Sequence, residues 1–178
     1  PGTGRSSYFI RSTCKDFLSN WLECHPALEI TEWQNWMKWA GFIKNEVKTY
    51  EYDPLEKNGV DLYFLSDELS EVLSKDSVLV TESGLTEVIL PTSIHMGLMQ
   101  RSIHPVSQGA MGFGLPAAIS VALHKKSAEV VLATGDGSIM MNLQEIQTMV
   151  HLGLPIKILL VVNDGYSVIR KRQKELFR

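Results

Sequence analysis

Apolar and polar positions divide the chain into a helical N-terminal part and a longer part in which strands and helices alternate. Residues 32–48 place Trp33, Trp36 and Trp39 at helical spacing, which predicts one amphipathic helix. We interpret the indole stripe as a packing surface for a neighbouring domain rather than a ligand cage, because such stripes usually pack against other elements. Residues 50–59 hold a proline, an Asn-Gly pair and four charges, and are typical of a connector.

Beyond the connector, short apolar runs alternate with stretches of helical periodicity. Such alternation, with almost wholly apolar strands, predicts an α/β domain whose parallel sheet is covered by helices on both faces. The expected strands are Val78–Thr81, Val130–Thr134 and Ile156–Val162, and the expected helices are Val60–Leu73, Leu115–Lys125 and Asn142–Leu152, the last with an Asn142/Glu145 capping pair and a stop at Gly153 and Pro155.

Composition narrows the class of protein. With 178 residues, 44% hydrophobic and 21% charged, the chain is expected to fold, and its net charge of −3 argues against nucleic acid as the main partner. We find no signal peptide and no apolar run near the roughly 20 residues that cross a bilayer. Cys14 and Cys24 form neither a disulfide framework nor a zinc site, which favours a cytoplasmic protein, and the ends at Pro1 and Arg178 look cut.

Polar residues follow two of the predicted strands. Asp136 comes directly after the second strand, and Asn163 follows the third, 27 positions later. A right-handed crossover brings such strands together, so we expect both side chains at the carboxyl edge of the sheet, where ligands bind. Carboxylate, amide and main-chain carbonyl oxygens suit Mg²⁺, which fills the rest of its shell with phosphate and water.

The residues around Asp136 suit an anion. Gly135 and Gly137 allow a tight turn, and the amides of Gly137 and Ser138 can point at an anion before a helix begins. A diphosphate bridged by Mg²⁺ satisfies all these groups.

A glycine-rich segment, residues 108–118 (QGAMGFGLPAA), also needs a role. Its order G-x-x-G-x-G, with no clear strand before it, does not match a dinucleotide fingerprint. Taken alone, the segment fits a close-packed helix start as well as a cofactor contact.

The three motifs in chain order, QGAMGFGLPAA, GDGS and the step from Asp136 to Asn163, resemble the cofactor domain of thiamine diphosphate enzymes of the acetolactate synthase and 2-oxoacid decarboxylase superfamily. The resemblance implies thiamine diphosphate and Mg²⁺ as cofactors, and a middle-domain remnant (residues 1–50), a linker (51–59) and a cofactor domain cut at its C-terminus (60–178). It implies Met111 as the apolar wedge under the bent cofactor, with the Gly109 carbonyl and Met111 amide on the aminopyrimidine. The implied metal ligands are Asp136, Asn163 and the Gly165 carbonyl, and the implied cofactor-binding residues are Gly84, Thr86, Gly109, Met111, Gly135, Gly137, Ser138, Asn163 and Tyr166.

The resemblance also implies a function. The chain would be the cofactor-binding portion of a 2-oxoacid decarboxylase or carboligase resembling the acetolactate synthase large subunit. The activating glutamate would come from the N-terminal domain of a partner subunit, so we expect at least a homodimer and no catalytic residue in this chain. The chain alone is expected to bind the cofactor weakly at best and to turn over nothing.

Departures from the family pattern keep alternatives open. Leu85 and Thr86 stand where acetolactate synthases carry Gln-His, and Val162 stands where many members have an asparagine. Thr86 can fill the diphosphate contact, as in decarboxylase relatives. The alternatives are a simple decarboxylase without carboligation, a separate cofactor subunit of a two-chain decarboxylase, which the Trp-rich leader argues against, and a non-catalytic nucleotide-phosphate-binding α/β module.

Other polar residues are expected to play smaller parts. We interpret His95 and His104 as loop residues in solvent, and His151 as a favourable partner for a helix C-terminus. The basic stretch from Arg170 to Arg178 is interpreted as a solvated helix face.

Overall fold

The computed structural model describes residues 10–24, 31–46 and 59–177. The chain divides into two compact units, residues 1–49 and 50–178. Over the described ranges, no helix combines the length and apolar character needed to span a bilayer.

The first unit contributes two helices, α1 (Cys14–Cys24) and α2 (Thr31–Glu46). Helix α2 confirms the helix predicted over residues 32–48 almost in full. Its three tryptophans are exposed, and the rings of Trp33 and Trp36 meet edge to face with centroids 6.0 Å apart. Packing of this stripe on a neighbouring domain stays a prediction.

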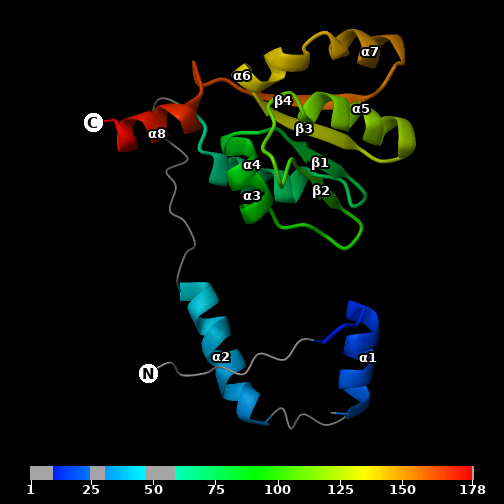
Figure 1. The fold of residues 1–178 in the computed structure, drawn as a ribbon, viewed down its shortest axis with the longest axis vertical. Coiled ribbons are helices and arrows are strands. Elements are labelled where there is room, and N and C mark those ends of the chain that lie inside the picture. Colours follow the sequence, from blue (N-terminus) through cyan, green and yellow to red (C-terminus); the bar gives the residue numbers. More distant parts are fainter. Residues whose placement is uncertain (1–9, 25–30, 47–58, 178) are drawn as a thin grey trace. The chain divides into compact units, whose positions relative to one another are not determined.

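The second unit is built on a parallel sheet of four strands in the order β2-β1-β3-β4 (Figure 1). The three strands predicted from the sequence are β1, β3 and β4, and they agree with the structure to within one residue at either end. The strands are β1 (Val78–Thr81), β2 (Arg101–Ile103), β3 (Val130–Gly135) and β4 (Ile156–Val161), and the helices are α3 (Leu62–Val72), α4 (Leu85–Ser93), α5 (Gly114–His124), α6 (Asp136–Ile139), α7 (Glu145–His151) and α8 (Ser167–Leu176).

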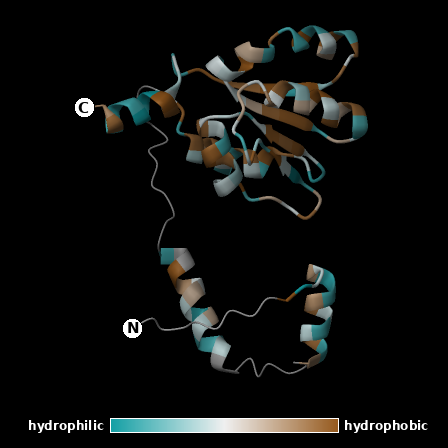
Figure 2. Cartoon of the chain, in the orientation of Figure 1, coloured by the Kyte–Doolittle hydropathy of each residue, from teal (hydrophilic) through white to brown (hydrophobic). Residues whose placement is uncertain are grey.

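Helices cover both faces of this sheet, as predicted (Figure 1). Along β3, Val130 and Leu132 face one core with α5, whereas Val131 and Ala133 face the other core with α3 and α4. Because successive strand residues point to opposite faces, a strand buried on both sides must be apolar at every position. Figure 2 shows this hydrophobic character in the strands and a largely hydrophilic α8, in line with the solvated helix predicted there.

Three local features differ from the sequence prediction. Strand β2 precedes the glycine-rich segment, and its three partly exposed residues are too few to show a pattern. Helix α4 was not predicted, and it carries Pro91 inside it. The Asn142/Glu145 capping pair is wrong: α7 begins at Glu145, and the Asn142 side chain instead donates to the Gly112 carbonyl at 2.6 Å. A tertiary hydrogen bond here replaces the local one.

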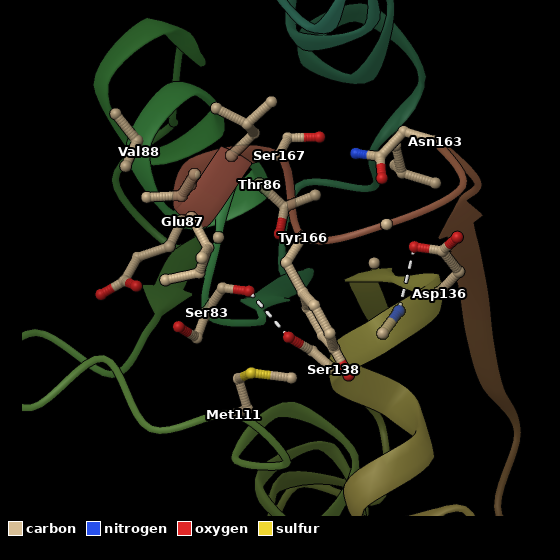
Figure 3. A pocket seen from close by; sticks show the side chains of 18 of the residues that line it. Ser83, Thr86, Glu87, Val88, Met111, Asp136, Ser138, Asn163, Tyr166 and Ser167 are labelled. Carbon is tan, nitrogen blue, oxygen red and sulfur yellow. Dashed lines mark hydrogen bonds between the residues drawn. The ribbon is translucent and has the colours of Figure 1, made fainter. Parts of the chain in front are cut away.

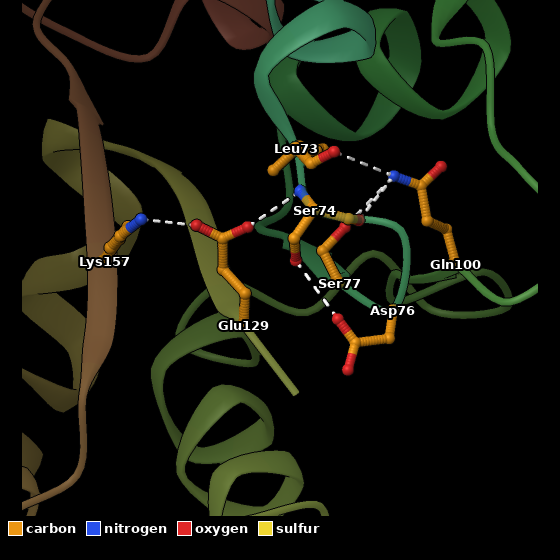
Figure 4. A network of polar contacts seen from close by, with 7 residues as sticks. All are labelled: Leu73, Ser74, Asp76, Ser77, Gln100, Glu129 and Lys157. Atoms are coloured by element: carbon orange, nitrogen blue, oxygen red, sulfur yellow. Dashed lines mark hydrogen bonds and ion pairs between the residues drawn. The ribbon is translucent and has the colours of Figure 1, made fainter. Parts of the chain in front are cut away.

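The amino end of the sheet is closed by a polar network (Figure 4). The Glu129 carboxylate pairs with Lys157 on β4 and accepts the Ser74 main-chain N–H at 2.9 Å. These bonds, that from Lys157 first, lower the pKa of Glu129 from 4.5 to about 2. The Gln100 amide donates to the Ser74 carbonyl at 2.8 Å and to the Ser77 hydroxyl at 3.3 Å.

Candidate functional site

A cavity of about 360 Å³ opens at the carboxyl edge of the sheet, a size typical of small-molecule sites. All eleven residues assigned to cofactor or metal binding from the sequence line it, and so do eight others. The eight others are Ser83, Leu85, Glu87, Val88, Val161, Ser167, Val168 and Ile169. The structure therefore brings together predicted residues that are up to 82 positions apart, from Gly84 to Tyr166.

The two residues expected at adjacent strand ends do meet there. Strands β3 and β4 pair in parallel as far as Gly135 and Val161, so the chain leaves both strands at the same level. In Figure 3 the Asp136 carboxylate points toward Asn163 across the cavity. The Asp136 Oδ1 accepts the Gly137 main-chain N–H at 2.9 Å. The predicted juxtaposition of Asp136 and Asn163 is thus confirmed.

The loop after β4 has an unusual backbone. Asp164 adopts φ +55° and Gly165 φ +148°, both in the left-handed half of the map. The Arg170 guanidinium donates to the Asp164 carbonyl at 2.9 Å, and a Cβ at position 165 would lie 2.3 Å from its Nη2. Helix α8 thereby holds the loop that presents Asn163 and Gly165 to the cavity.

The donor set fits a hard divalent cation. Asp136, Asn163 and the Gly165 carbonyl offer carboxylate, amide and main-chain oxygens, the ligands that Mg²⁺ prefers. Over residues 10–24, 31–46 and 59–177, no cluster of three or more His, Cys, Asp or Glu side chains could hold a metal ion. A cation at this edge would therefore complete its shell with oxygens of a ligand or water.

The charges of the cavity are one-sided. Its charged lining residues are Asp136 and Glu87, and no Lys, Arg or His from the described part of the chain lines it. An anion in the cavity would be repelled by these two carboxylates, and main-chain amides would be the main groups that offset the repulsion. An anionic ligand therefore needs a cation to accompany it.

Helix α6 begins at Asp136, immediately after β3, and its first residues face the cavity. A Cβ at position 137 would lie 2.5 Å from the Tyr166 ring, so only glycine permits this approach. The Ser138 side chain is buried, and its hydroxyl donates to the Ser83 carbonyl at 2.9 Å (Figure 3). An anion held here would rely on main-chain amides, because the Ser138 hydroxyl proton is already used. To take part, the Gly137 N–H would have to give up its present hydrogen bond to the Asp136 carboxylate.

Thr86 lines the cavity, but its hydroxyl is also committed. The side chain is 3% exposed, and its Oγ1 donates to the Glu82 carbonyl one turn earlier at 2.8 Å. A residue in the first turn of a helix often satisfies its hydroxyl in this way. Thr86 therefore contributes to the shape of the cavity, but its hydroxyl proton is not available to a phosphate.

The glycine-rich segment forms another wall of the cavity, away from Asp136 and Asn163 (Figure 3). Gly109 and Gly112 adopt φ +55° and +85°, conformations that disfavour other residues. Between them Met111 lines the cavity with 37% of its surface exposed. Its thioether is thus available to an apolar ligand group instead of filling a core.

Sequence reasoning missed the groups that fasten this wall. Glu82, Ser83 and Asn142 each hydrogen-bond to main-chain groups of residues 109–114. Glu82 follows an apolar strand and is itself buried, a combination that a sequence does not reveal. One signal was available for Ser83 and Glu82: both follow β1 at the carboxyl edge of the sheet.

The histidines of the described ranges do not line the cavity. His95 is exposed, as expected, whereas His104 is half-buried and its Nδ1 has no hydrogen-bond partner. Neither lines the cavity. His151 lies in the last turn of α7, as expected of a partner for a helix C-terminus.

The residues that form the cavity lie in a part of the chain that is similar to known proteins. Residues 83–178 match the family described as "Thiamine pyrophosphate enzyme, C-terminal TPP binding domain". The chain is 34% identical over 114 residues to acetolactate synthase isozyme 2 large subunit of Escherichia coli (strain K12), covering 64% of this chain and 21% of that protein. It is 26% identical over 169 residues to acetolactate synthase large subunit of Lactococcus lactis subsp. lactis (strain IL1403), covering 94% and 28%.

A solved structure is similar as well. The thiamine diphosphate-dependent 4-hydroxybenzoylformate decarboxylase of Rhodococcus jostii RHA1 superposes with a TM-score of 0.64 at 25% identity, covering 73% of this chain and 24% of that chain. The chain therefore spans between 21% and 28% of the length of these three relatives.

Proposed function

The chain belongs to the thiamine pyrophosphate enzyme family through its C-terminal TPP-binding domain, and from this premise we propose that it is the cofactor-binding portion of a 2-oxoacid decarboxylase or carboligase resembling the acetolactate synthase large subunit. Thiamine diphosphate would bind with Mg²⁺ in the cavity at the carboxyl edge of the sheet. The observation that carries the proposal is that this one cavity gathers the Asp136 and Asn163 oxygens, the α6 amides and the Met111 wall.

Each part of the cavity would contact a different part of the ligand. Asp136, Asn163 and the Gly165 carbonyl would hold Mg²⁺, and the Gly137 and Ser138 amides would hold the diphosphate that it bridges. The remaining diphosphate-side residues, Gly84, Thr86, Gly135 and Tyr166, would shape the surface around it. This division explains how an anion binds between two carboxylates.

The glycine-rich wall would bind the opposite end. Met111 would support the bend of the cofactor, while the Gly109 carbonyl and the Met111 amide would hydrogen-bond the aminopyrimidine. Thiamine diphosphate supplies the carbon nucleophile of the reaction, and the protein contributes binding, orientation and electrostatics. We further propose that the activating glutamate comes from an N-terminal domain of a partner subunit, which makes the working enzyme at least a homodimer.

A decarboxylase without carboligation is the second candidate. The solved relative from Rhodococcus is by name a decarboxylase, and Leu85 and Thr86 replace the Gln-His of acetolactate synthases. Both candidates share the cofactor site and differ in the reaction step after carbon dioxide has left.

The decisive experiment titrates the 178-residue chain with thiamine diphosphate and with ADP, each with and without Mg²⁺. Amide chemical shifts in NMR spectra report binding even when it is weak. We expect thiamine diphosphate to bind better than ADP, only with Mg²⁺, and with shifts at Gly137 and Met111. Tighter binding of ADP would favour a nucleotide-phosphate module and overturn the proposal. Release of carbon dioxide from pyruvate by this chain alone would contradict the assignment of the activating glutamate to another domain.

A further inference from the structure

The glycine-rich segment that forms one wall of the cavity, residues 109–114, is hydrogen-bonded by the buried carboxylate of Glu82. Glu82 follows β1, is 1% exposed, and continues the pairing with β3 through its N–H, which donates to the Ala133 carbonyl at 2.9 Å. Its Oε1 accepts the Phe113 N–H at 3.1 Å, and its Oε2 accepts the Gly114 N–H at 2.7 Å. The Ser83 N–H donates to Oε1 as well, at 3.0 Å. These main-chain donors satisfy a carboxylate in the interior, and Glu82 caps the start of α5 from another element.

The backbone at Gly114 lies so close to the Glu82 carboxylate that there is no room for a side chain. A Cβ there would lie 2.9 Å from the Glu82 Oε2 and 2.8 Å from a Leu132 methyl group. Only glycine lets the start of α5 come this near the carboxylate.

Two further side chains hold the carbonyls of the left-handed glycines. The Ser83 hydroxyl donates to the Gly109 carbonyl at 2.6 Å, and the Asn142 amide donates to the Gly112 carbonyl at 2.6 Å. Ser83 also accepts the Ser138 hydroxyl through its own carbonyl at 2.9 Å. Ser83 therefore connects the wall around Met111 to helix α6, on the side assigned to the diphosphate.

We propose that Glu82, Ser83 and Asn142 are positioning residues that hold residues 109–114 in the shape that receives the aminopyrimidine end of thiamine diphosphate, before any ligand arrives. The inference rests on the proposed function. These three residues, called here the wall clamp, need not touch the ligand. They act on the Gly109 carbonyl and the Met111 side chain, which do.

The physical reason is the freedom of the segment that they hold. Glycines lose more backbone entropy on ordering than other residues, and a glycine-rich loop without external bonds would have to be ordered by the ligand itself. Bonds made in the ligand-free protein remove that part of the binding penalty. The clamp also sets which way Met111 faces, since it fixes the backbone on both sides of this residue.

If Glu82, Ser83 and Asn142 position the binding segment, their loss should affect the two ligands differently, whereas a role in stability alone would affect both equally. Loss of a clamp bond should weaken binding of thiamine diphosphate, which has an aminopyrimidine, and spare inorganic diphosphate, which binds only the Mg²⁺ side. Damage to the fold would weaken both ligands together. The ratio of the two dissociation constants, each measured with Mg²⁺, is therefore the readout.

The experiment compares Ser83→Ala and Asn142→Ala with the unaltered 178-residue chain by NMR titration. Each variant should raise the dissociation constant of thiamine diphosphate about three- to tenfold, the effect of removing one hydrogen bond, with that of inorganic diphosphate unchanged. Ser93→Ala is the matched control, because its hydroxyl also donates to a main-chain carbonyl, that of Ile89, but lies outside the cavity. It should change neither constant.

Glu82→Gln tests the third member without reference to any ligand. Either orientation of the new amide puts an NH₂ group against a main-chain N–H, so amide hydrogen exchange at Phe113 and Gly114 should accelerate in the ligand-free chain. Should this variant fail to fold, the serine and asparagine variants still decide the matter. The clamp proposal is overturned if the ratio of the two dissociation constants is unchanged in Ser83→Ala and Asn142→Ala, whether neither ligand or both ligands bind more weakly. Tighter binding of ADP than of thiamine diphosphate by the unaltered chain overturns the proposed function, while the exchange data report separately on the clamp.

Discussion

The two ends of the same parallel sheet use their polar side chains in opposite ways. At the amino end, the Glu129 carboxylate pairs with Lys157 and accepts the Ser74 main-chain N–H. The Gln100 side-chain amide there donates to the Ser74 carbonyl and the Ser77 hydroxyl. At the carboxyl end, Asp136 and Glu87 face a cavity with no basic side chain in its described lining. Paired groups at one end stabilise the fold, and carboxylates without a counter-charge at the other are available to a cation and its ligand.

The backbone shows the same contrast. Five of the six left-handed φ angles among the described residues lie around the cavity, at Gly84, Gly109, Gly112, Asp164 and Gly165, and the sixth, at Gly153, lies in the loop that leads into β4. Such conformations recur where a chain must pass close to a ligand or present main-chain groups to it. The difference between the ends leads to four predictions, each a substitution that tests one end or the region between them.

The largest effect is expected at the carboxyl end. Asp136→Asn removes the one carboxylate of the proposed magnesium set without changing its size, and should weaken Mg²⁺-dependent binding of thiamine diphosphate by about 100-fold or more. NMR titration, which reports binding even when it is weak, measures the loss. Asp76→Asn is the matched control, because this aspartate is exposed and lies at the amino end of the sheet, outside the cavity lining. Equal losses in the two variants would contradict the assigned metal site.

The second effect belongs to the amino end and is one of stability. The pKa of Glu129 is about 2 in the folded protein and 4.5 ordinarily, so the folded state favours its charged form. That contribution is fully present above about pH 4.5 and is lost as the pH falls toward 2. Glu129→Gln should therefore lower the free energy of unfolding by about 1–2 kcal/mol at neutral pH, a range reduced for solvent around Lys157.

Denaturant unfolding at neutral and acidic pH measures this difference. It should shrink as the pH falls below the ordinary pKa of glutamate, and binding of thiamine diphosphate should not change. A difference independent of pH would show that packing, not charge, connects Glu129 to its neighbours.

The third effect divides the carboxyl end into two parts. Met111→Ala removes the apolar wall opposite the metal ligands and should weaken thiamine diphosphate binding about three- to tenfold, because the shorter side chain buries less apolar surface against the ligand. Binding of inorganic diphosphate with Mg²⁺ should stay the same. Equal weakening of both ligands in paired titrations would argue against a contact between Met111 and the rings of the cofactor.

The smallest effect is expected away from both ends. His95 is exposed and does not line the cavity, so His95→Ala should change the free energy of unfolding by less than about 0.5 kcal/mol and leave cofactor affinity unaltered. Thermal unfolding with and without thiamine diphosphate and Mg²⁺ measures both quantities. A clear loss of affinity would place this histidine in the site after all.

The main elements of the fold were predictable because burial imposes a simple pattern. A strand covered on both faces must be apolar throughout, and β1 and β3 are nearly so. Strand β4 is mostly apolar in sequence, but it lies at the edge of the sheet and is only partly buried. Strand β2 has three partly exposed residues, and Pro91 obscures the pattern of α4, so neither was predicted. Asn142 shows the limit at a finer scale, since a residue suited to cap a helix donates instead to a carbonyl 30 positions away.

The meeting of Asp136 and Asn163 was predictable for a related reason. Asp136 and Asn163 follow consecutive parallel strands, and the handedness of the crossover then places both at one edge. Their position directly after these strands is therefore enough to predict that they lie close together.

By itself, then, the sequence determined the parallel α/β layers and the edge at which Asp136 and Asn163 meet, because strand burial and connection order are properties of sequential position. The other predicted lining residues, such as Met111, were assigned through the family resemblance, and eight lining residues were not predicted. Only the tertiary structure decided how those residues are held. It showed that the Thr86 and Ser138 hydroxyls are already engaged, and that Glu82, Ser83 and Asn142 fasten the glycine-rich wall. Such bonds join groups far apart in the chain, and which donor reaches which acceptor depends on the packed arrangement of all the elements together.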